Sequence, residues 1–437
     1  MTSETTPSAA GPAPSFAEAL ATWARIGVLS FGGPTAQIAL MHRIIVEEKR
    51  WLGEQQYLNA LSFCMLLPGP EAMQLATYAG WRLHGLVGGL AAGLLFVLPG
   101  AAIVLALSVV YALYGTVPIV EAIFFGIKAA VLVIVVEALI RISKRALKLP
   151  VHWLLAALSF IAIFFLALPF PLIIAAAALY GFWLGAPDGT AQQTAPSPGV
   201  RPVETIGVIA IWLVVWIAPL AALAAIYGSD HVLSQLAWFF SKLAVVTFGG
   251  AYAVLAYMGQ DVVTRYGWLE AGQMMDGLGL AETTPGPLIL VTEFVGFLAA
   301  FRHGGEPALA MGLLGAFVAL WATFAPCFLW IFAGAPYIEW IIAQPRLRGA
   351  LAAITAAVVG VILNLAVWFG LHVFFGTVDL VEWGALKLWL PDAASLDWRV
   401  VLLAAISAIL LLRLHWGIAQ VLAVSAGLAL VLRFAAV

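Results

Sequence analysis

The chain has 437 residues, of which 64% are hydrophobic and 10% charged, with a formal net charge of −2 and a mean hydropathy of +1.05. This composition excludes a soluble globular domain, and without a long basic tract it also excludes a nucleic-acid-binding protein. Stretches of roughly 20 apolar residues predict an all-α polytopic membrane protein with about 13 membrane segments. The apolar runs do not alternate with polar residues, so a closed β-barrel is excluded.

The chain begins with residues 1–15, which are rich in Ser, Thr, Pro and Ala and predict a disordered tail without a cleaved signal peptide. A first transport repeat follows at 16–185. Its predicted membrane segments are 16–44, 57–83, 86–114, 118–142, 151–168 and 170–184. The first two are interrupted by Phe-Gly-Gly and by Pro-Gly-Pro, where a helix is expected to break because Gly tolerates unusual dihedrals and Pro lacks a backbone donor.

Residues 186–204 form a linker of Pro, Gly, Gln, Thr and Ser, and 205–230 an extra connecting helix without a counterpart in the first repeat. A second transport repeat occupies 231–437. Its predicted segments are 233–258, 274–301, 309–333, 347–375, 400–414 and 416–434. The chain is therefore expected to consist of two homologous halves.

The duplication is visible without a gap. Phe31-Gly32-Gly33, Trp51 and Pro68-Gly69-Pro70 return as Phe248-Gly249-Gly250, Trp268 and Pro285-Gly286-Pro287, each 217 positions later (248−31, 268−51, 285−68). Helix breakers repeated within apolar sequence are typical of secondary transporters built from internal repeats.

The six segments of the first repeat and the extra helix precede the second repeat, which makes seven crossings. That odd number predicts halves of opposite orientation, with the basic loop 141–148 and the N-terminus in the cytoplasm and the C-terminus outside. The charges conflict with this topology, because Arg43, Lys49 and Arg50 would then face outward. If the Pro-Gly-Pro segments were re-entrant hairpins, those cations would move inside, but the halves would become parallel. We favour the inverted arrangement.

A broken helix exposes free N–H groups that attract anions. Arg25 and Lys242 also differ by 217, and each lies six residues, or roughly 9 Å of helix, before Phe-Gly-Gly. An intramembrane cation needs a polar cavity, an acidic partner or an anion, although snorkelling to the interface is an alternative. The predicted anion-binding residues are Arg25, Lys242, Gly32, Gly33, Gly249, Gly250, Gly69, Gly286, Ser30, Thr247, Gln74, Thr283 and Thr284.

Other polar residues near the breaks suit proton coupling or structural ion pairs, because a carboxylate would repel an oxyanion. These are Glu71, Glu282, the matched pair Asn59 and Asp276, and Lys128 and Glu137 of one helix. Lys128 and Glu137 align at a looser offset of 227 with Thr355 and Asn364.

No nucleotide-binding loop occurs, so an ion or voltage gradient is expected to supply the energy. No catalytic set, metal-ligand spacing or cofactor motif stands out, and Cys64 and Cys327 are isolated, so we expect neither an enzyme nor a metal site. The expected partners are a small oxyanion, protons and membrane lipids; the oligomeric state, including a homo-oligomer, stays open.

Two copies of a unit with Phe-Gly-Gly near its start, Trp-Leu about twenty residues later and Pro-Gly-Pro at its end resemble the CHR (chromate ion transporter) family in its long, two-domain form. The resemblance covers the chain from about residue 16. It implies a multi-pass protein of the bacterial inner membrane that exports chromate as an antiporter driven by the proton-motive force and confers chromate resistance. Half two has Ala251 in place of Pro34 and Leu288 in place of Glu71. The two halves are therefore not expected to be functionally equivalent, and the functions that only one half performs are expected in half one.

Two other functions stay open. Uptake or exchange of sulfate, which shares the shape and charge of chromate, cannot be separated from chromate export by sequence. A membrane enzyme or lipid-handling protein could hold a head-group phosphate at the same broken helices, although no region combines an acid, a base and a nucleophile.

Overall fold

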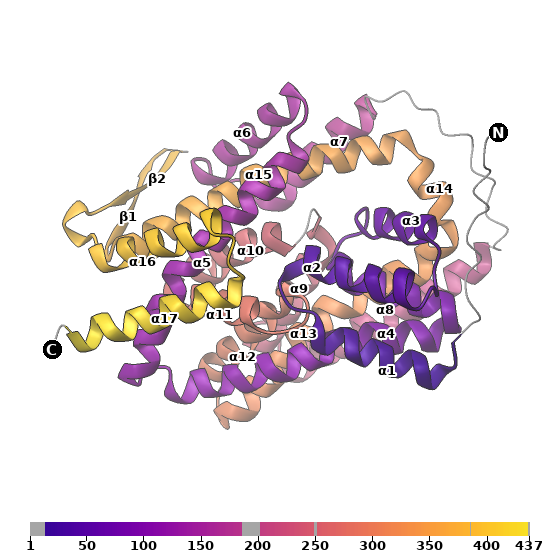
Figure 1. Ribbon diagram of the computed structural model, residues 1–437, viewed down its shortest axis with the longest axis horizontal. Helices are drawn as coiled ribbons and strands as arrows, with labels where there is room; N and C mark the ends of the chain where they lie inside the picture. The colour runs from indigo at the N-terminus through magenta and orange to yellow at the C-terminus, as the bar shows by residue number, and fades with distance from the viewer. Residues whose placement is uncertain (1–13, 186–201, 249–250, 385, 436–437) are drawn as a thin grey trace.

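The computed structural model describes residues 14–185, 202–248, 251–384 and 386–435, and it consists almost entirely of helices (Figure 1). Half one contains α1 (Phe16–Leu29), α2 (Gly33–His42), η1 (Arg43–Glu48), α3 (Glu54–Cys64), α4 (Glu71–Tyr114), α5 (Pro118–Ala146), α6 (Pro150–Phe164) and α7 (Phe170–Leu184). Then α8 (Pro202–Tyr227) connects the halves. Most of the predicted tail and most of the predicted linker lie outside the described residues.

Half two repeats this order. It contains α9 (Val232–Val246), α10 (Ala251–Gln260), η2 (Asp261–Arg265), α11 (Ala271–Thr283), η3 (Leu288–Leu290), α12 (Val291–His303), α13 (Ala308–Gly334), η4 (Ala335–Tyr337), α14 (Ile338–Ala343), α15 (Pro345–Phe374), η5 (Ala393–Ser395), α16 (Trp398–Ala408), η6 (Ile409–Arg413) and α17 (Ile418–Ala435). The fold is that of an all-α polytopic membrane protein, as predicted.

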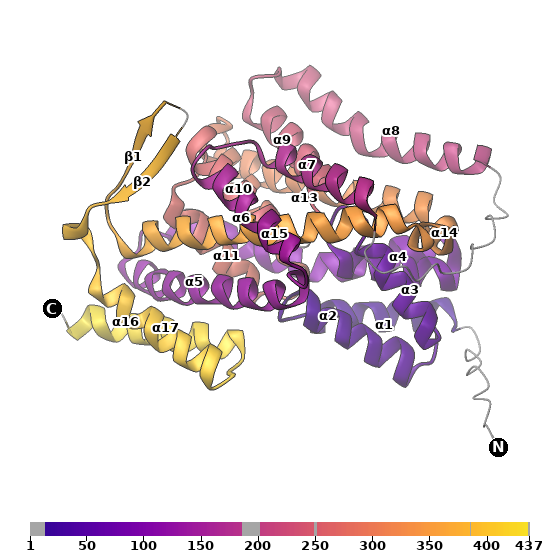
Figure 2. The ribbon, with the colours of Figure 1, turned by 90° about the horizontal axis from the view of Figure 1, so that it is seen from above.

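Within the described residues, five helices are long and apolar enough to cross a membrane: α4, α5, α8, α13 and α15. Helices α4, α8 and α15 run roughly along the long axis of the molecule, whereas α5 is inclined to it (Figures 1 and 2). Helix α1 begins at one end of this axis and α17 ends at the other, and we call these ends the N side and the C side. Helices α3 and α14 lie toward the N side, and the β-hairpin toward the C side (Figure 1).

The Phe-Gly-Gly segment of half one turns back instead of crossing. The chain reverses at Gly32 and Gly33, whose φ angles of 83° and 76° suit glycine, and α2 then begins. The returning η1 ends beside the first turns of α1: Lys49 Nζ lies 2.7 Å from Glu18 Oε1, and the Trp23 and Trp51 rings are 6.4 Å apart. Both ends of this hairpin therefore lie on the N side.

The Pro-Gly-Pro segment of half one forms a second re-entrant hairpin. Its two arms are α3 and the first part of α4, residues 71–83. Gln56 at the start of α3 and Arg82 at the end of the second arm line the same cavity, so the two arms begin and end close together. Helix α4 is then divided by non-helical backbone at His84 and Gly85, where Gly85 has φ 62° and ψ −151°. Only residues 85–114 continue across the molecule.

Half two contains the matching hairpins. His231, before α9, contacts the carbonyl of Gly304 after α12 at 3.3 Å, and Arg302 at the end of α12 donates to Gln273 Oε1 near the start of α11 at 2.7 Å. The Phe239 ring of α9 lies 5.6 Å from the Trp268 ring beyond η2. Both hairpins thus begin and end on one side.

The crossing part of α4 shows that the two halves are inverted. At its N-side end, His84 contacts the carbonyl of Pro14 at 2.9 Å. In its middle, Gly100 packs against the carbonyl of Pro285. At its C-side end, the Tyr111 hydroxyl donates to Asp276 Oδ2 of α11 at 2.7 Å. The half-two hairpins therefore enter from the C side.

This arrangement corrects part of the predicted topology. The interrupted segments 16–44, 57–83, 233–258 and 274–301 are re-entrant hairpins. Between the hairpins of the two halves, the helices long enough to cross a membrane are α4, α5 and α8. Re-entrant Pro-Gly-Pro segments do not make the halves parallel, because the Phe-Gly-Gly segments turn back as well. Arg43, Lys49 and Arg50, expected outside, lie on the N side with the 141–148 loop, which removes the conflict with the charge rule.

Short helix pairs cross over between the halves. Helices α6 and α7 pack on α15, with Gly181 against the carbonyl of Gly349, while α16 and α17 pack on α5, with the Ser425 hydroxyl donating to the Gly126 carbonyl at 2.8 Å. Each crossing helix α5 or α15 is thus covered by the other half.

An antiparallel β-hairpin of β1 (Val378–Trp383) and β2 (Leu386–Pro391), which the predicted helical segments did not include, lies on the C side. The chain then enters α16 at Asp397, whose carboxylate accepts hydrogen bonds from the Arg399 backbone and guanidinium. The guanidinium bond holds the pKa of Asp397 below its ordinary value.

Candidate functional site

The tips of the hairpins from both halves meet in the interior through a reciprocal pair of hydrogen bonds. The Gly69 N–H donates to the Thr247 carbonyl at 2.9 Å, and the Gly286 N–H donates to the Ser30 carbonyl at 2.8 Å. Both pairs are related by the offset of 217, since 30+217=247 and 69+217=286. The contact is therefore two-fold, as expected where two repeats face each other.

Two buried amide side chains hold the broken backbone at these tips. Gln37 Nε2 donates to the carbonyls of Gly286 at 2.6 Å and Ser30 at 3.2 Å, and Gln74 Nε2 donates to the carbonyl of Pro68 at 2.7 Å. These bonds satisfy carbonyl groups that a broken helix would otherwise leave unpaired. The tips are consequently fixed relative to one another by both halves.

A cavity of about 120 Å³ lies beside the tips. Three helices begin on its wall, because Pro34 and Thr35 open α2, Glu71 opens α4, and Ala251 and Tyr252 open α10. Their N–H groups and dipoles contribute positive potential to this cavity. The other lining residues are Cys64, Met65, Leu67, Gly69, Arg141, Ile142, Arg145, Leu351 and Thr355.

Two arginines at the end of α5 add positive charge to this wall. Arg145 Nη2 lies 3.4 Å from Met65 Sδ, near the Pro-Gly-Pro tip, and Arg141 pairs with Glu137 one turn earlier at 3.6 Å. The side chain of Arg141 remains 41% exposed. The cavity lies between the tips and the end of α5. Its helix N-termini, two guanidinium groups and hydroxyls suit a small oxyanion.

Comparison with known proteins identifies the family. A family model described as chromate transporter matches residues 17–182 and 234–432. The chain belongs to the chromate transporter family. Because the two matched regions lie on either side of α8, the family pattern occurs twice in this chain.

Several relatives of this family carry related names. A chromate transport protein of Cupriavidus metallidurans is 32% identical over 349 residues, which cover 78% of this chain and 80% of the relative. One of Pseudomonas aeruginosa is 32% identical over 369 residues, or 82% of each chain. A probable chromate transport protein of Synechococcus elongatus is 30% identical over 410 residues, covering 91% of this chain and 96% of the relative. No solved structure matches significantly.

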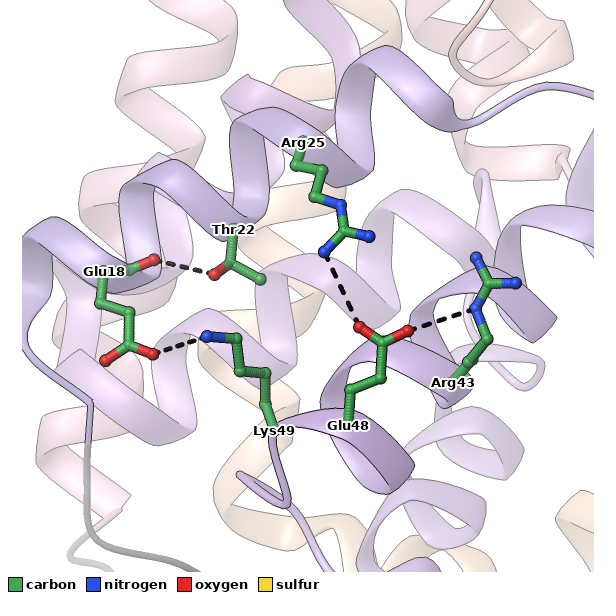
Figure 3. Close-up of polar contacts among 6 residues, drawn as sticks. All are labelled: Glu18, Thr22, Arg25, Arg43, Glu48 and Lys49. Carbon is green, nitrogen blue, oxygen red and sulfur yellow. Dashed lines mark hydrogen bonds and ion pairs between the residues drawn. The ribbon is translucent and has the colours of Figure 1, made fainter.

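In this member of the chromate transporter family, the two cations singled out from the sequence do not line the cavity. Arg25 lies 3.7 Å from Glu48 of η1, which also lies 3.6 Å from Arg43 (Figure 3). Lys242 lies over the ring of Tyr257, 5.5 Å from its centroid. Arg25 therefore joins the two arms of a hairpin.

The predicted hydroxyl ligands donate to their own helices. Ser30 Oγ donates to the Ile26 carbonyl at 2.6 Å, and Thr247 Oγ1 donates to the Leu243 carbonyl. Thr283 and Thr284 likewise donate to carbonyls one turn earlier in α11. Of the predicted glycines, only Gly69 lines the cavity; Gly32 and Gly33 form the turn before α2, Gly286 lies at the opposite tip, and Gly249 and Gly250 lie outside the described residues.

The predicted carboxylates occupy three separate places. Glu71 lines the cavity, whereas the buried Glu282 accepts a hydrogen bond from the Tyr252 hydroxyl at 2.7 Å. Asp276 lies 3.4 Å from Lys128 of the other half, at the C side. Asn59, the counterpart of Asp276, accepts a hydrogen bond from Gln55 at 2.9 Å on the N side.

Four residues of interest were missed. Arg141 and Arg145 were treated only as a cytoplasmic marker, although their spacing of four places both on one face of a helix. Gln37 shares with Gln74 a position shortly after a helix break. Glu293 of α12 is 1% exposed, and its Oε2 has no hydrogen-bond partner among the described residues. The available signal was a third acid within the apolar segment 274–301, after Asp276 and Glu282.

Proposed function

We propose that this chain exports chromate from the cytoplasm and that the anion enters through the cavity at the hairpin tips. Membership of the chromate transporter family supports transport of chromate across a membrane. The observation that carries the route is the convergence of three helix N-termini with Arg141 and Arg145 on one wall. These groups attract a dianion without covalent chemistry, so we propose a transporter and not an enzyme.

In this proposal the N side is cytoplasmic. Ten described cations lie at or near that side, namely Arg43, Lys49, Arg50, Arg82, Arg141, Lys144, Arg145, Lys148, Arg346 and Arg348. Six lie near the C side, namely Lys128, Arg265, Arg302, Lys387, Arg399 and Arg433. Excess Lys and Arg mark the cytoplasmic face of a membrane protein. The cavity therefore faces the compartment from which export starts.

The two sides differ chemically. At the offset of 227 that relates Lys128 to Thr355, the counterparts of Arg141 and Arg145 are Trp368 and His372 (141+227, 145+227). Their rings lie 4.3 Å apart, and Trp389 of β2 packs edge-on against both. A cationic wall on the N side attracts an anion, whereas the aromatic wall on the C side carries no matching pair of cations. This difference supports binding of chromate from the N side.

The membrane potential supplies part of the driving force in this proposal. A dianion that leaves an inside-negative cell gains about 4.6 kcal/mol per 100 mV, twice the value for one charge. Protons would contribute through carboxyl groups of the interior. Glu71 is the candidate on the cavity wall, since its ionised form would repel the anion, and the unpartnered Glu293 is the candidate within α12.

The test is the flux of labelled chromate in proteoliposomes, with an imposed potassium-diffusion potential and with an imposed pH gradient. We expect either gradient to accelerate net chromate movement and excess sulfate to compete weakly. Sulfate carried faster than chromate under the same gradients would instead favour sulfate exchange. Lipid turnover without ion flux would refute the transporter proposal.

A further inference from the structure

A second, larger cavity lies on the N side, away from the hairpin tips. Its volume is about 320 Å³, within the range of small-molecule sites. Gln56 and Asn59 of α3 line one wall, Tyr78, Trp81 and Arg82 of α4 another, and residues 335–340 of η4 and α14 the third. It therefore lies between the open end of the Pro-Gly-Pro hairpin and the connection from α13 to α15.

This cavity combines one cation with one anion. Arg82 and Glu339 both line it, and among the residues that the structure describes neither takes part in an ion pair or a side-chain hydrogen bond. Tyr78 lines the same cavity as both charges. An unpaired guanidinium and an unpaired carboxylate can bind a ligand that carries a negative and a positive group close together.

The position of the cavity favours a lipid as the source of that ligand. Trp81, Tyr337 and Trp340 line it at the end of membrane-crossing helices, where aromatic rings anchor proteins at the membrane interface. Trp340 is 46% exposed, and Leu58, which lies between Gln56 and Asn59 in α3, is 42% exposed. A head group in the cavity would leave its acyl chains beside such apolar surface.

We propose that this cavity binds the head group of an amine-bearing phospholipid, phosphatidylethanolamine. Arg82 binds the phosphate, because a guanidinium matches phosphate oxygens through two parallel N–H groups. Glu339 accepts hydrogen bonds from the primary ammonium, and the aromatic rings contact the same cation. The lipid would thereby join the Pro-Gly-Pro hairpin of half one to α14 of half two.

Native mass spectrometry of the full-length protein, released from detergent, tests this proposal. Delipidated protein is titrated with phosphatidylethanolamine, phosphatidylglycerol or phosphatidylcholine. We expect phosphatidylethanolamine to bind most tightly, because phosphatidylglycerol lacks the ammonium and phosphatidylcholine cannot donate from its quaternary amine. Equal retention of phosphatidylethanolamine and phosphatidylglycerol by the wild-type protein would overturn the proposal.

Two variants test the contacts with the phosphate and with the ammonium of the head group separately. Arg82→Gln should weaken binding of all three lipids by about tenfold, which corresponds to the loss of about 1.4 kcal/mol. Glu339→Gln should weaken only phosphatidylethanolamine and so remove the preference among lipids. Lys144→Gln, on the same side but outside the cavity, is the matched control and should bind like the wild-type protein.

Two further readouts complete the experiment. The thermal unfolding midpoint in detergent identifies a misfolded variant, and a folded Arg82→Gln protein that binds all lipids normally would overturn the proposal. Soluble phosphoethanolamine is titrated in parallel. If it binds as tightly as the lipid, the ligand is a water-soluble phosphate ester, and the lipid assignment is refuted.

Discussion

Replacing Gly69 with alanine tests whether the hairpin tips form the site as described. Gly69 has a φ of 119°, and a Cβ atom there would lie 2.8 Å from Gln74 Nε2 and 2.9 Å from Cys327 Sγ. Holding a residue other than glycine in such a conformation costs about 1–3 kcal/mol. The displaced tip would also weaken the bond from Gly69 N–H to the Thr247 carbonyl, at about 1 kcal/mol.

Gly69→Ala is therefore expected to lower the free energy of unfolding by about 2–4 kcal/mol, the sum of these two contributions. Two matched glycines scale the effect. At Gly286, with φ 91°, the nearest atom is the end of the flexible Leu290 side chain at 3.0 Å, and at Gly33, with φ 76°, no atom lies within 4 Å. The order of destabilisation should be Gly69, then Gly286, then Gly33.

The assay is the midpoint of thermal unfolding in detergent, together with the initial rate of chromate flux in proteoliposomes. Gly69→Ala should lower the midpoint most and, because Gly69 lines the cavity, lower the flux even below the unfolding temperature. A Gly69→Ala protein as stable and active as Gly33→Ala would show that the Pro-Gly-Pro tip is not held as the structure indicates.

Two other predictions concern buried charges. Lys128→Met should destabilise the protein by about 3–5 kcal/mol, because it leaves the Asp276 carboxylate buried with Tyr111 as its remaining partner. In thermal unfolding, the double variant with Asp276→Asn should recover part of this lost stability. If the losses of the two single variants simply add, the pairing is contradicted. The Glu293→Gln protein should still exchange chromate across the proteoliposome membrane, but a pH gradient should no longer accelerate this exchange. Glu121→Gln, which changes an exposed acid paired with Arg433, serves as the control. If a pH gradient still accelerates exchange by the Glu293→Gln protein, Glu293 is excluded from proton coupling.

Much of the architecture could be predicted because it depends on composition and repetition. Apolar length identifies membrane segments, and the ungapped offset of 217 matches Ser30 with Thr247 and Gly69 with Gly286. The structure shows that these matched residues meet crosswise at the two-fold contact. The direction of each arm could not be predicted, because hydropathy reports how apolar a segment is and not whether it crosses or turns back.

The candidate site was harder to predict for a related reason. Arg25 precedes the break by six residues in sequence, yet the returning η1 brings Glu48 to it, and a hairpin partner of this kind depends on tertiary structure. Arg141 and Arg145 are distant in sequence from the breaks and reach the cavity only because α5 ends there. The contact of Lys128 with Asp276 joins the two halves, so local sequence did not indicate it.

The central claim is that chromate binds at the N-side cavity through the end of α5. Equilibrium binding of labelled chromate to the purified protein tests it most directly, with Arg141→Gln/Arg145→Gln compared with Lys144→Gln from the same basic run. The double variant should bind chromate at least about tenfold more weakly, since two cations each contribute on the order of 1 kcal/mol at a partly exposed wall, and Lys144→Gln should match the wild-type protein. Unchanged affinity in a folded double variant, or an equal loss in Lys144→Gln, would contradict the assignment of this cavity.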